Sequence, residues 1–209
     1  MAKEEKEREL KKIRDEVFNL KNSPLYDYRT KNKFYPVVGE GNHSAKIILI
    51  GEAPGKNEAL TGRPFCGAAG KFLDQLLQSV NLNRSETYIT NIVKDRPPEN
   101  RDPLPEEIAL YAPFLDRQIN AIQPKIIVAL GRFSMKYLME KFGLSDKIDL
   151  ISRLHGQAFE VNTPYGKINI FISYHPAAAL YDGSAREVLL KDFKNLESLI
   201  RSILSFNIF

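Results

Sequence analysis

The chain alternates between short apolar runs and longer stretches in which apolar residues recur at helical spacing. The short runs are rich in branched side chains and predict strands at Lys46–Ile50, Thr87–Val93, Lys125–Leu130 and Ile168–Ser173. The longer stretches predict helices at about 68–80, 105–122, 131–142 and 185–204. Strands that alternate with helices favour a parallel sheet with helices on both faces.

Two further segments extend this prediction. An amphipathic helix within residues 1–22 is predicted by apolar residues at helical spacing among charges, namely Leu10, Ile13, Val17 and Leu20. A polar loop then runs to Gly41. Gln157–Val161 and Ile168–Phe171 flank a turn and predict a hairpin that adds an antiparallel strand. We therefore expect a three-layer α/β/α fold of the α/β class, with a mostly parallel sheet of four to five strands, in one domain spanning residues 1–209.

Composition and charge narrow the class of protein. The 209 residues are 43% hydrophobic, which is enough for one full core. Thirty Lys and Arg residues against 26 Asp and Glu residues give a net charge of +4, which permits a DNA-facing surface without requiring one. No apolar run reaches the roughly 18 residues of a membrane span, and the first residues lack the apolar core of a signal peptide. With a single cysteine, we expect a cytoplasmic protein.

The most distinctive segment is residues 51–73, GEAPGKNEALTGRPFCGAAGKFL. It follows an apolar run and leads into an amphipathic stretch, so it reads as a strand, a rigid loop rich in Gly and Pro, and a helix. Ligands bind at such strand ends in open α/β folds. The segment matches neither the phosphate-binding loop that ends in Gly-Lys-Ser/Thr nor the GxGxxG fingerprint.

Four motifs, in order and at matching spacing, resemble those of the uracil-DNA glycosylase superfamily, and most closely those of its family 4. They are residues 51–73, Thr90–Lys94, Lys125–Gly131 and Tyr174–Ala178. The resemblance implies a DNA repair enzyme that hydrolyses the N-glycosidic bond of flipped-out deoxyuridine, releases uracil and leaves an abasic site. Two alternatives stay open. One is a glycosylase for another deaminated base, such as hypoxanthine or mismatched uracil, and the other is a catalytically silent DNA-binding or replication-accessory homologue.

Three residues match the family's base-binding positions. Phe65 would stack on the flipped pyrimidine, although a core Phe that anchors the loop is the alternative. Asn91 would read uracil, because its amide can accept from N3–H and donate to O4; a structural Asn with paired amide groups is the alternative. His175 would donate a neutral imidazole N–H to O2 and stabilise the charge that develops there.

The first motif supplies further candidates. The glutamate that matches Glu52 lines the active site in the family, and the one that matches Glu58 lies where a thymine methyl group would intrude. Better-studied families carry a water-activating aspartate at the position of Ala53, so we expect catalysis here to depend on leaving-group stabilisation and on a water held by Glu52 or the main chain. Both glutamates could instead be solvated loop residues.

Other residues are candidates for DNA contacts. Leu180 lies in an apolar loop after His175 and is the candidate wedge that fills the space left by the flipped base; packing in the core is its alternative. Phosphate contacts are assigned to basic residues that could equally be ordinary surface charges: Lys94, Arg153 and Arg186, with Arg96 and Arg101. His155 stays ambiguous, with a phosphate contact as one option.

The chain departs from family 4 at the iron–sulfur cluster. The resemblance places the four cluster cysteines at Leu20, Ser23, Asp95 and Tyr111, and the single cysteine, Cys66, lies in the first motif. Because a cluster needs several thiolates, we expect neither a cluster nor any other cofactor. Hydrophobic packing, with Asp95 taking a Tyr or Lys partner, is expected in its place. For partners, we expect single- or double-stranded DNA that contains uracil and a monomeric protein, with a weak possibility of a sliding clamp at the C-terminal tail, Ser202–Phe209.

Overall fold

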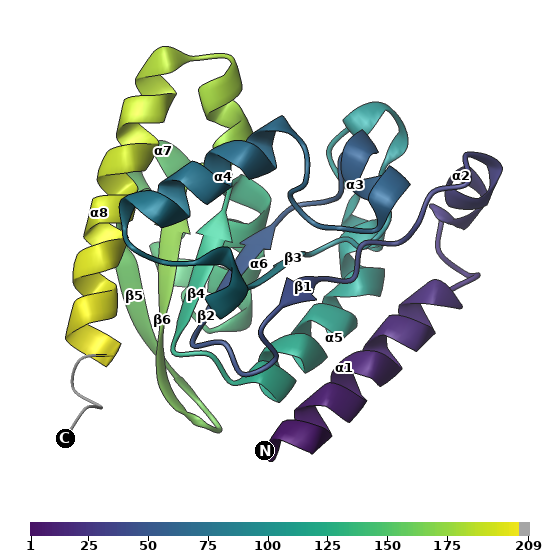
Figure 1. Cartoon of the computed structure of the whole chain (residues 1–209), viewed down its shortest axis with the longest axis horizontal. Helices are drawn as coiled ribbons and strands as arrows, with labels where there is room; N and C mark the ends of the chain where they lie inside the picture. Colours follow the sequence, from purple (N-terminus) through teal and green to yellow (C-terminus); the bar gives the residue numbers. More distant parts are fainter. Residues whose placement is uncertain (205–209) are drawn as a thin grey trace.

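A mixed sheet of six strands, in the order β1-β3-β2-β4-β6-β5, forms the centre of the molecule (Figure 1). The computed structural model describes residues 1–204, so most of the tail considered for a sliding clamp lies outside the described residues. The strands are β1 (Glu40–Gly41), β2 (Ile47–Gly51), β3 (Tyr88–Asn91), β4 (Ile126–Leu130), β5 (Ala158–Thr163) and β6 (Gly166–Ser173). The four inner strands pair in parallel, and β1 and β5 pair antiparallel at the two edges. The predicted α/β fold with a mostly parallel sheet is confirmed, with one more strand than expected.

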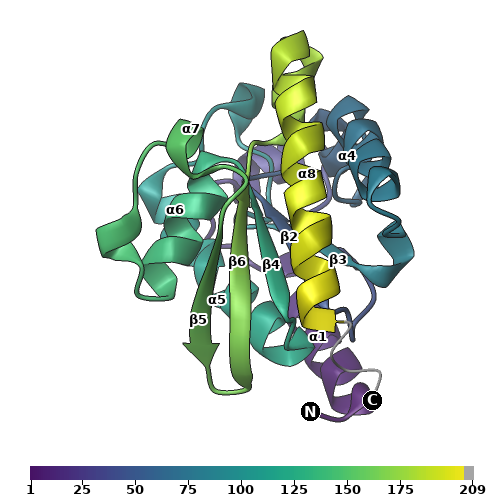
Figure 2. The same cartoon turned by 90° about the vertical axis from the view of Figure 1, so that its left-hand side faces the viewer.

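Helices cover both faces of this sheet (Figure 2). The α-helices are α1 (Lys3–Phe18), α2 (Tyr26–Lys31), α3 (Lys56–Thr61), α4 (Ala68–Ser79), α5 (Pro105–Ile122), α6 (Arg132–Lys141), α7 (Ile151–Leu154) and α8 (Gly183–Leu204). Short 3₁₀ turns are η1 (Arg84–Glu86), η2 (Pro98–Asn100), η3 (Ser145–Lys147) and η4 (Pro176–Leu180). Within residues 1–204, no helix combines the length and the apolar character that crossing a membrane requires.

Alternating strand residues explain the three layers. In β2, Ile48 and Ile50 pack into the core beneath α1, α5 and α6, whereas Ile47 and Leu49 pack into the core beneath α4 and α8. Successive side chains of a strand point to opposite faces, so a run that is apolar at every position must be covered on both sides. The continuous apolar runs of β2 and β4 therefore dictate helices on both faces.

Some short elements differ from the sequence prediction. The region predicted as a polar loop up to Gly41 contains α2 and β1, and the first motif contains α3. These elements have two to six residues, too few for hydrophobic periodicity to reveal. Helix α1 ends at Phe18, so Leu20 lies beyond it and packs against the core as a partly buried residue.

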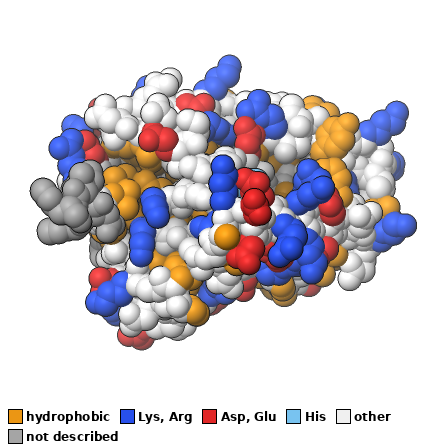
Figure 3. Space-filling model, turned by 60° about the horizontal axis from the view of Figure 1, so that its bottom comes forward, with side chains coloured by type: hydrophobic (Ala, Val, Ile, Leu, Met, Phe, Trp, Pro, Cys, Tyr) orange, Lys and Arg blue, Asp and Glu red, His pale blue; other side chains and the backbone are white. Residues whose placement is uncertain are grey.

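Charges of both signs are mixed on the face that Figure 3 presents, the bottom of the molecule in Figure 1. Lys and Arg side chains lie among Asp and Glu side chains there, and apolar side chains show between them. The net charge of +4 is therefore not gathered into a single basic patch on this face.

The carboxyl ends of the parallel strands meet at one edge of the sheet. Gly51, the last residue of β2, pairs with Asn91, the last residue of β3. The pairing continues into the loops, because the amide of Ile92 donates to the carbonyl of Gly51 (3.1 Å) and the amide of Val93 donates to the carbonyl of Glu52 (3.0 Å). The segments that carry the motif residues are thereby fixed to each other before any side chain contributes.

Candidate active site

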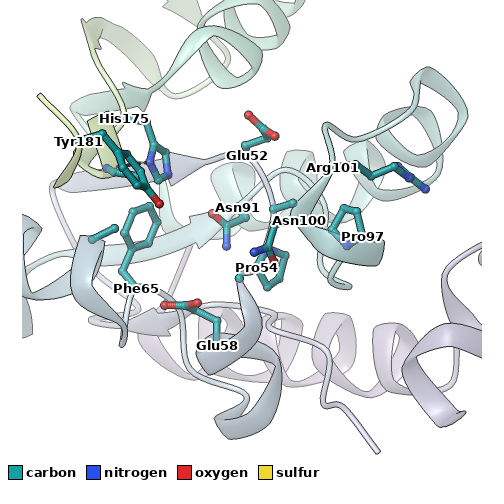
Figure 4. Close-up of a pocket in the computed structure, with 14 residues that line it drawn as sticks. Glu52, Pro54, Glu58, Phe65, Asn91, Pro97, Asn100, Arg101, His175 and Tyr181 are labelled. Carbon is teal, nitrogen blue, oxygen red and sulfur yellow. Dashed lines mark hydrogen bonds between the residues drawn. The ribbon is translucent and has the colours of Figure 1, made fainter. Parts of the chain in front are cut away.

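A pocket of about 350 Å³ opens at this edge (Figure 4). It is lined by Glu52, Ala53, Pro54, Gly55, Glu58, Phe65, Ala69, Asn91, Pro97, Asn100, Arg101, His175, Ala177 and Tyr181. The six residues predicted for catalysis or base binding are all among them. The fold brings them together from distant parts of the chain, because residues as far apart as Glu52 and His175 line the same pocket.

Asn91 lies at the inner end of the pocket with 2% of its surface exposed. Its Oδ1 is buried and accepts no hydrogen bond from any residue of the range 1–204. Gly51 makes this position possible, because a Cβ there would lie 2.3 Å from Asn91 Oδ1 and 2.8 Å from the Phe65 ring. A buried acceptor without a donor is costly, so this oxygen is suited to a ligand that brings an N–H group.

Phe65 forms one wall through a backbone held in the left-handed region, with φ of 47°. Its carbonyl accepts from Arg84 (3.2 Å), which also binds the carbonyl of Pro64 (2.6 Å). A Cβ on Gly70 would lie 1.8 Å from the Phe65 carbonyl oxygen, so only glycine permits this loop path. The ring stacks toward His175, with centroids 5.4 Å apart and planes inclined by 29°.

The carboxylate of Glu58 holds the loop that carries Phe65 through hydrogen bonds to its main chain. Its Oε1 accepts from the amides of Cys66 (3.0 Å) and Gly67 (2.9 Å), at the start of α4. Figure 4 shows this carboxylate beside the Phe65 ring at the pocket wall. Glu58 therefore shapes the wall as well as facing the cavity, so it is not a solvated loop residue.

His175 is held as a neutral imidazole. Its Nδ1 accepts from the amide of Ala177 (3.1 Å), so the ring proton of the neutral form lies on Nε2. Burial lowers the pKa of His175 to about 4, although the negative charge of Glu58 opposes this shift. At neutral pH the side chain is therefore an uncharged N–H donor beside the pocket.

The pKa of Glu52 is shifted upward, whereas that of His175 is shifted downward. Burial is the main cause that raises the pKa of its carboxyl group to about 7, and the negative charge of Asp102 adds to it, while Arg132 opposes it. A carboxyl group that titrates near neutral pH in a cleft is suited to binding or activating water.

The residues predicted to contact DNA are placed differently from one another. Leu180 is 45% exposed on η4. Arg153 is exposed and pairs with Asp149 (3.1 Å), and Arg186 is exposed, donates to Gln75 (3.0 Å) and lies over the Phe72 ring. The role of each in DNA binding stays a prediction.

Lys94 requires a correction. It is completely buried, and its Nζ contacts Thr90, Asn91 and Gln118 within the protein. A side chain enclosed in this way has no path to a DNA phosphate, so the predicted phosphate contact is wrong. Its basic character and its position after a strand did not distinguish it from a surface lysine in the sequence.

The pocket also contains Pro97 and Asn100, which the sequence reasoning missed, and Arg101, which it assigned only to a DNA phosphate. Pro97, Asn100 and Arg101 form the wall opposite Phe65, from the segment that contains η2 (Figure 4). Their signal was the proline-rich segment that follows Asn91, which predicts a rigid loop at the same sheet edge. Tyr181 lies at the mouth and is 90% exposed, twice as much as Leu180.

His155 lies outside the pocket lining and is held by Asp192. Its Nδ1 lies 3.0 Å from both carboxylate oxygens, and its ring packs 4.7 Å from the Tyr174 ring. Asp192 is buried, so this contact ties α8 to the C-terminal end of α7. The ambiguous histidine thus has a structural partner.

Three of the four positions that resemble cluster ligands converge, and the four do not fit an iron–sulfur cluster. Tyr111 donates to Asp95 Oδ2 (2.6 Å), and its hydroxyl lies 2.8 Å from Ser23 Oγ. Arg29 completes the group through Nη1, which lies 3.1 Å from Asp95 Oδ2. Leu20 packs nearby in the same core. These side chains offer no thiolate, which such clusters require, and among residues 1–204 no group of three or more His, Cys, Asp or Glu side chains could hold a metal ion.

Replacing Tyr111 by Phe is expected to lower the free energy of unfolding by about 1–3 kcal/mol, because buried Asp95 loses a hydrogen-bond donor. Urea denaturation followed by circular dichroism measures this change. Tyr181→Phe is the matched control, since it removes the same hydroxyl from an exposed side chain. Equal stability of the two variants would show that the hydrogen-bonded group does not tie α5 to the N-terminal segment.

Comparisons with known proteins agree with this geometry. The family model described as the uracil DNA glycosylase superfamily matches residues 38–198. The chain is 46% identical to a type-4 uracil-DNA glycosylase of Sulfurisphaera tokodaii, over 91% of this chain and 84% of the relative. It is 43% identical to a type-4 uracil-DNA glycosylase of Archaeoglobus fulgidus, over 88% of this chain and 89% of the relative. A type-5 uracil-DNA glycosylase of Thermus thermophilus is 33% identical over 67% of this chain and 68% of the relative.

The family model covers most of the chain, including β2, β3, β4 and β6 with the pocket residues at their carboxyl ends. Several relatives are more than 30% identical over more than two thirds of their own length. The chain therefore belongs to the uracil DNA glycosylase superfamily, and its similarity is greater to type-4 than to type-5 members.

Proposed function

We propose that this protein is a uracil-DNA glycosylase that hydrolyses the bond between uracil and deoxyribose in a flipped-out nucleotide. The observation that carries the proposal is the buried, unpartnered Oδ1 of Asn91 within the described residues. Uracil presents an N3–H donor to this acceptor, whereas cytosine presents an acceptor nitrogen at the same position. The amide nitrogen of Asn91 would then donate to O4 of uracil.

His175 and Phe65 supply the next two requirements. The Phe65 ring offers a flat apolar surface for the flipped base. The Nε2–H of neutral His175 is available to donate to uracil O2, where negative charge grows as the glycosidic bond breaks. Because His175 is already neutral at physiological pH, it supports the leaving anion by hydrogen bonding rather than by proton transfer.

Glu52 is the candidate for the sugar side of the reaction. An ionised Glu52 would stabilise the positive charge that develops on deoxyribose and orient the attacking water. Ala53, at the position where other families carry an aspartate, leaves Glu52 as the acidic group of this strand end. The exposed side chains of Leu180 and Tyr181 lie next to the pocket, where they can occupy the space that the base leaves in the duplex.

The activity is tested with single- and double-stranded oligonucleotides that carry one uracil, followed by alkaline cleavage of the abasic site. Strand scission at the uracil position is expected, and oligonucleotides with thymine or cytosine there should remain intact. Parallel substrates with hypoxanthine and mismatched uracil test the alternative base choice. Absence of scission with every deaminated base would refute both enzymatic readings and favour a silent DNA-binding homologue.

The rate of uracil release is expected to fall as pH decreases through about 7, the pKa of Glu52, because the protonated carboxyl group loses its charge. His175, with a pKa of about 4, does not titrate in this range. Single-turnover rates from about pH 5 to about pH 9 measure the profile.

Two variants test whether this pH dependence comes from the carboxyl group of Glu52. Glu52→Gln should give a slow rate that no longer changes with pH. Asp102→Asn should keep the wild-type plateau but move the midpoint to lower pH, since the Asp102 charge raises the pKa of Glu52. A wild-type profile that is flat across this range would contradict the role of an ionised Glu52.

A further inference from the structure

Lys94 is a fully buried lysine whose ammonium group is surrounded by neutral oxygen acceptors. It follows β3 by three residues, and its Nζ reaches back to the end of that strand. The acceptors around Nζ are Asn91 O at 2.7 Å, Gln118 Oε1 at 2.7 Å and Thr90 Oγ1 at 2.8 Å. One of the three is the main-chain carbonyl of the residue that reads the base in the proposed function.

The hydrogen bonds around Lys94 Nζ show which groups must donate and which must accept. The hydroxyl of Thr90 donates to the carbonyl of Val38 (2.7 Å), so its oxygen can only accept from Lys94. The amide nitrogen of Gln118 donates to the same carbonyl (2.8 Å) and lies 3.1 Å from Tyr88 Oη, so Gln118 Oε1 also accepts from Lys94. Nζ must therefore supply three protons, and only the ammonium form carries three.

The charge of this ammonium has no acidic partner. No carboxylate within residues 1–204 forms a salt bridge with Lys94, and the neighbouring Asp95 is engaged by Arg29 and Tyr111. Burial lowers the pKa of Lys94, and the three short hydrogen bonds oppose this effect by favouring the charged form. A buried cation that lacks a counter-ion is compensated when an anion forms nearby.

We propose that Lys94 is a positioning residue that fixes Asn91 through its carbonyl and places a buried positive charge behind the uracil leaving anion. The inference rests on the proposed function, because it requires a base that leaves as an anion from the Asn91 pocket. It explains why a basic side chain is enclosed three residues from the strand end, where neither solvent nor DNA reaches it.

The test compares wild type with Lys94→Met, whose unbranched side chain is one atom shorter and lacks the charge and the donors. Single-turnover rates are measured at saturating DNA with uracil and with 5-fluorouracil as the leaving base. We expect a loss of about 10- to 100-fold for uracil and a smaller loss for 5-fluorouracil, whose anion needs less stabilisation. The ratio of the 5-fluorouracil rate to the uracil rate should therefore increase in Lys94→Met.

Tyr111→Phe is the control for a purely structural effect, since it removes a buried hydrogen bond from the adjacent network and leaves the Lys94 contacts in place. Its rate ratio for the two bases should match that of wild type. If Lys94→Met keeps the wild-type rate or the wild-type ratio, the inference is wrong. Inactivity of wild type on uracil would instead refute the proposed function itself.

If Lys94→Met does not fold, the charge of Lys94 can be tested in the wild-type protein. Nitrogen-15 NMR of lysine-labelled protein at neutral pH should show a side chain with three protons that exchange slowly with solvent. Lys94 is the buried lysine of the described residues, so a slowly exchanging signal identifies it. A neutral amine at this site would overturn the proposal.

Discussion

Replacing His175 by alanine is expected to slow uracil release by about 10²- to 10³-fold, while DNA affinity changes little. His175 lines the pocket and caps η4 by accepting from Ala177, so its ring is fixed before the base arrives. A donor fixed in this way gains strength as charge develops on uracil O2, so its loss affects the reacting state more than the bound state. Single-turnover rates at saturating DNA, with fluorescence anisotropy for binding, separate the two effects.

His155→Ala is the matched control for this experiment. His155 is bonded to Asp192 and does not line the pocket, so its removal should leave the saturated rate largely unchanged. If it contacts a DNA phosphate, only the anisotropy measurement should respond. A saturated rate for His175→Ala close to that of wild type would show that the leaving anion is stabilised by other groups.

Much of the fold could be predicted because β2 and β4, at the centre of the sheet, are apolar at every position. Such runs require cover on both faces, and this alone predicts the layers of α/β/α architecture. The expected hairpin is confirmed as β5 and β6, which pair from Ala158 with Phe171 to Thr163 with Gly166. The two-residue strand β1 could not be predicted, because it depends on pairing with β3 rather than on its own residues.

Two pocket residues could be predicted where a residue type and a strand end coincide, whereas Glu58 and Phe65 were predicted from the resemblance of the first motif. Asn91 and His175 follow apolar runs, and a polar side chain there points to the sheet edge. Lys94 has the same local sequence signal, yet it turns back into the core to satisfy the Asn91 carbonyl. Asn100 belongs to a left-handed backbone, with φ of 56°, that brings it to the pocket, and no periodic pattern reports such a turn.

At the positions that match the cluster cysteines, the sequence predicted the replacement residues but only part of their contacts. Replacement of the cysteines by Ser23, Asp95 and Tyr111 was visible in the sequence, and so was the need of a buried Asp for a partner. The observed partners are Tyr111 and Arg29, with Arg29 also donating to the carbonyl of Phe18 (3.1 Å). Arg29 could not be assigned from spacing, because it comes from α2, a helix too short to be predicted.

Replacing Asn91 is expected to change both the rate and the choice of base. Asn91→Ala should lower the rate on uracil by about 10³-fold or more, since both base-reading hydrogen bonds are lost at a side chain that is buried from bulk water. Asn91→Asp should gain activity on cytosine. Oligonucleotides that carry one uracil or one cytosine, assayed by alkaline cleavage, measure both changes.

The gain on cytosine follows from the hydrogen-bonding groups of the two bases. In the Asn91→Asp variant, the protonated carboxyl group that burial favours can donate to N3 of cytosine while its other oxygen accepts from the N4 amino group, a pairing that the amide oxygen of Asn91 facing N3 cannot make. The space that Gly51 leaves beside Oδ1 lets the side chain keep the same orientation, because aspartate and asparagine have the same shape.

Asn91→Leu is the control for this exchange, because it has a similar volume and no polar atoms. It should release neither base at an appreciable rate, which separates recognition by hydrogen bonds from a pocket that is merely loosened. If Asn91→Leu and Asn91→Asp excise cytosine equally well, the amide does not read the base. If Asn91→Asp retains its preference for uracil, then recognition comes from the main chain around Gly51 and Glu52, and the buried Oδ1 serves another purpose.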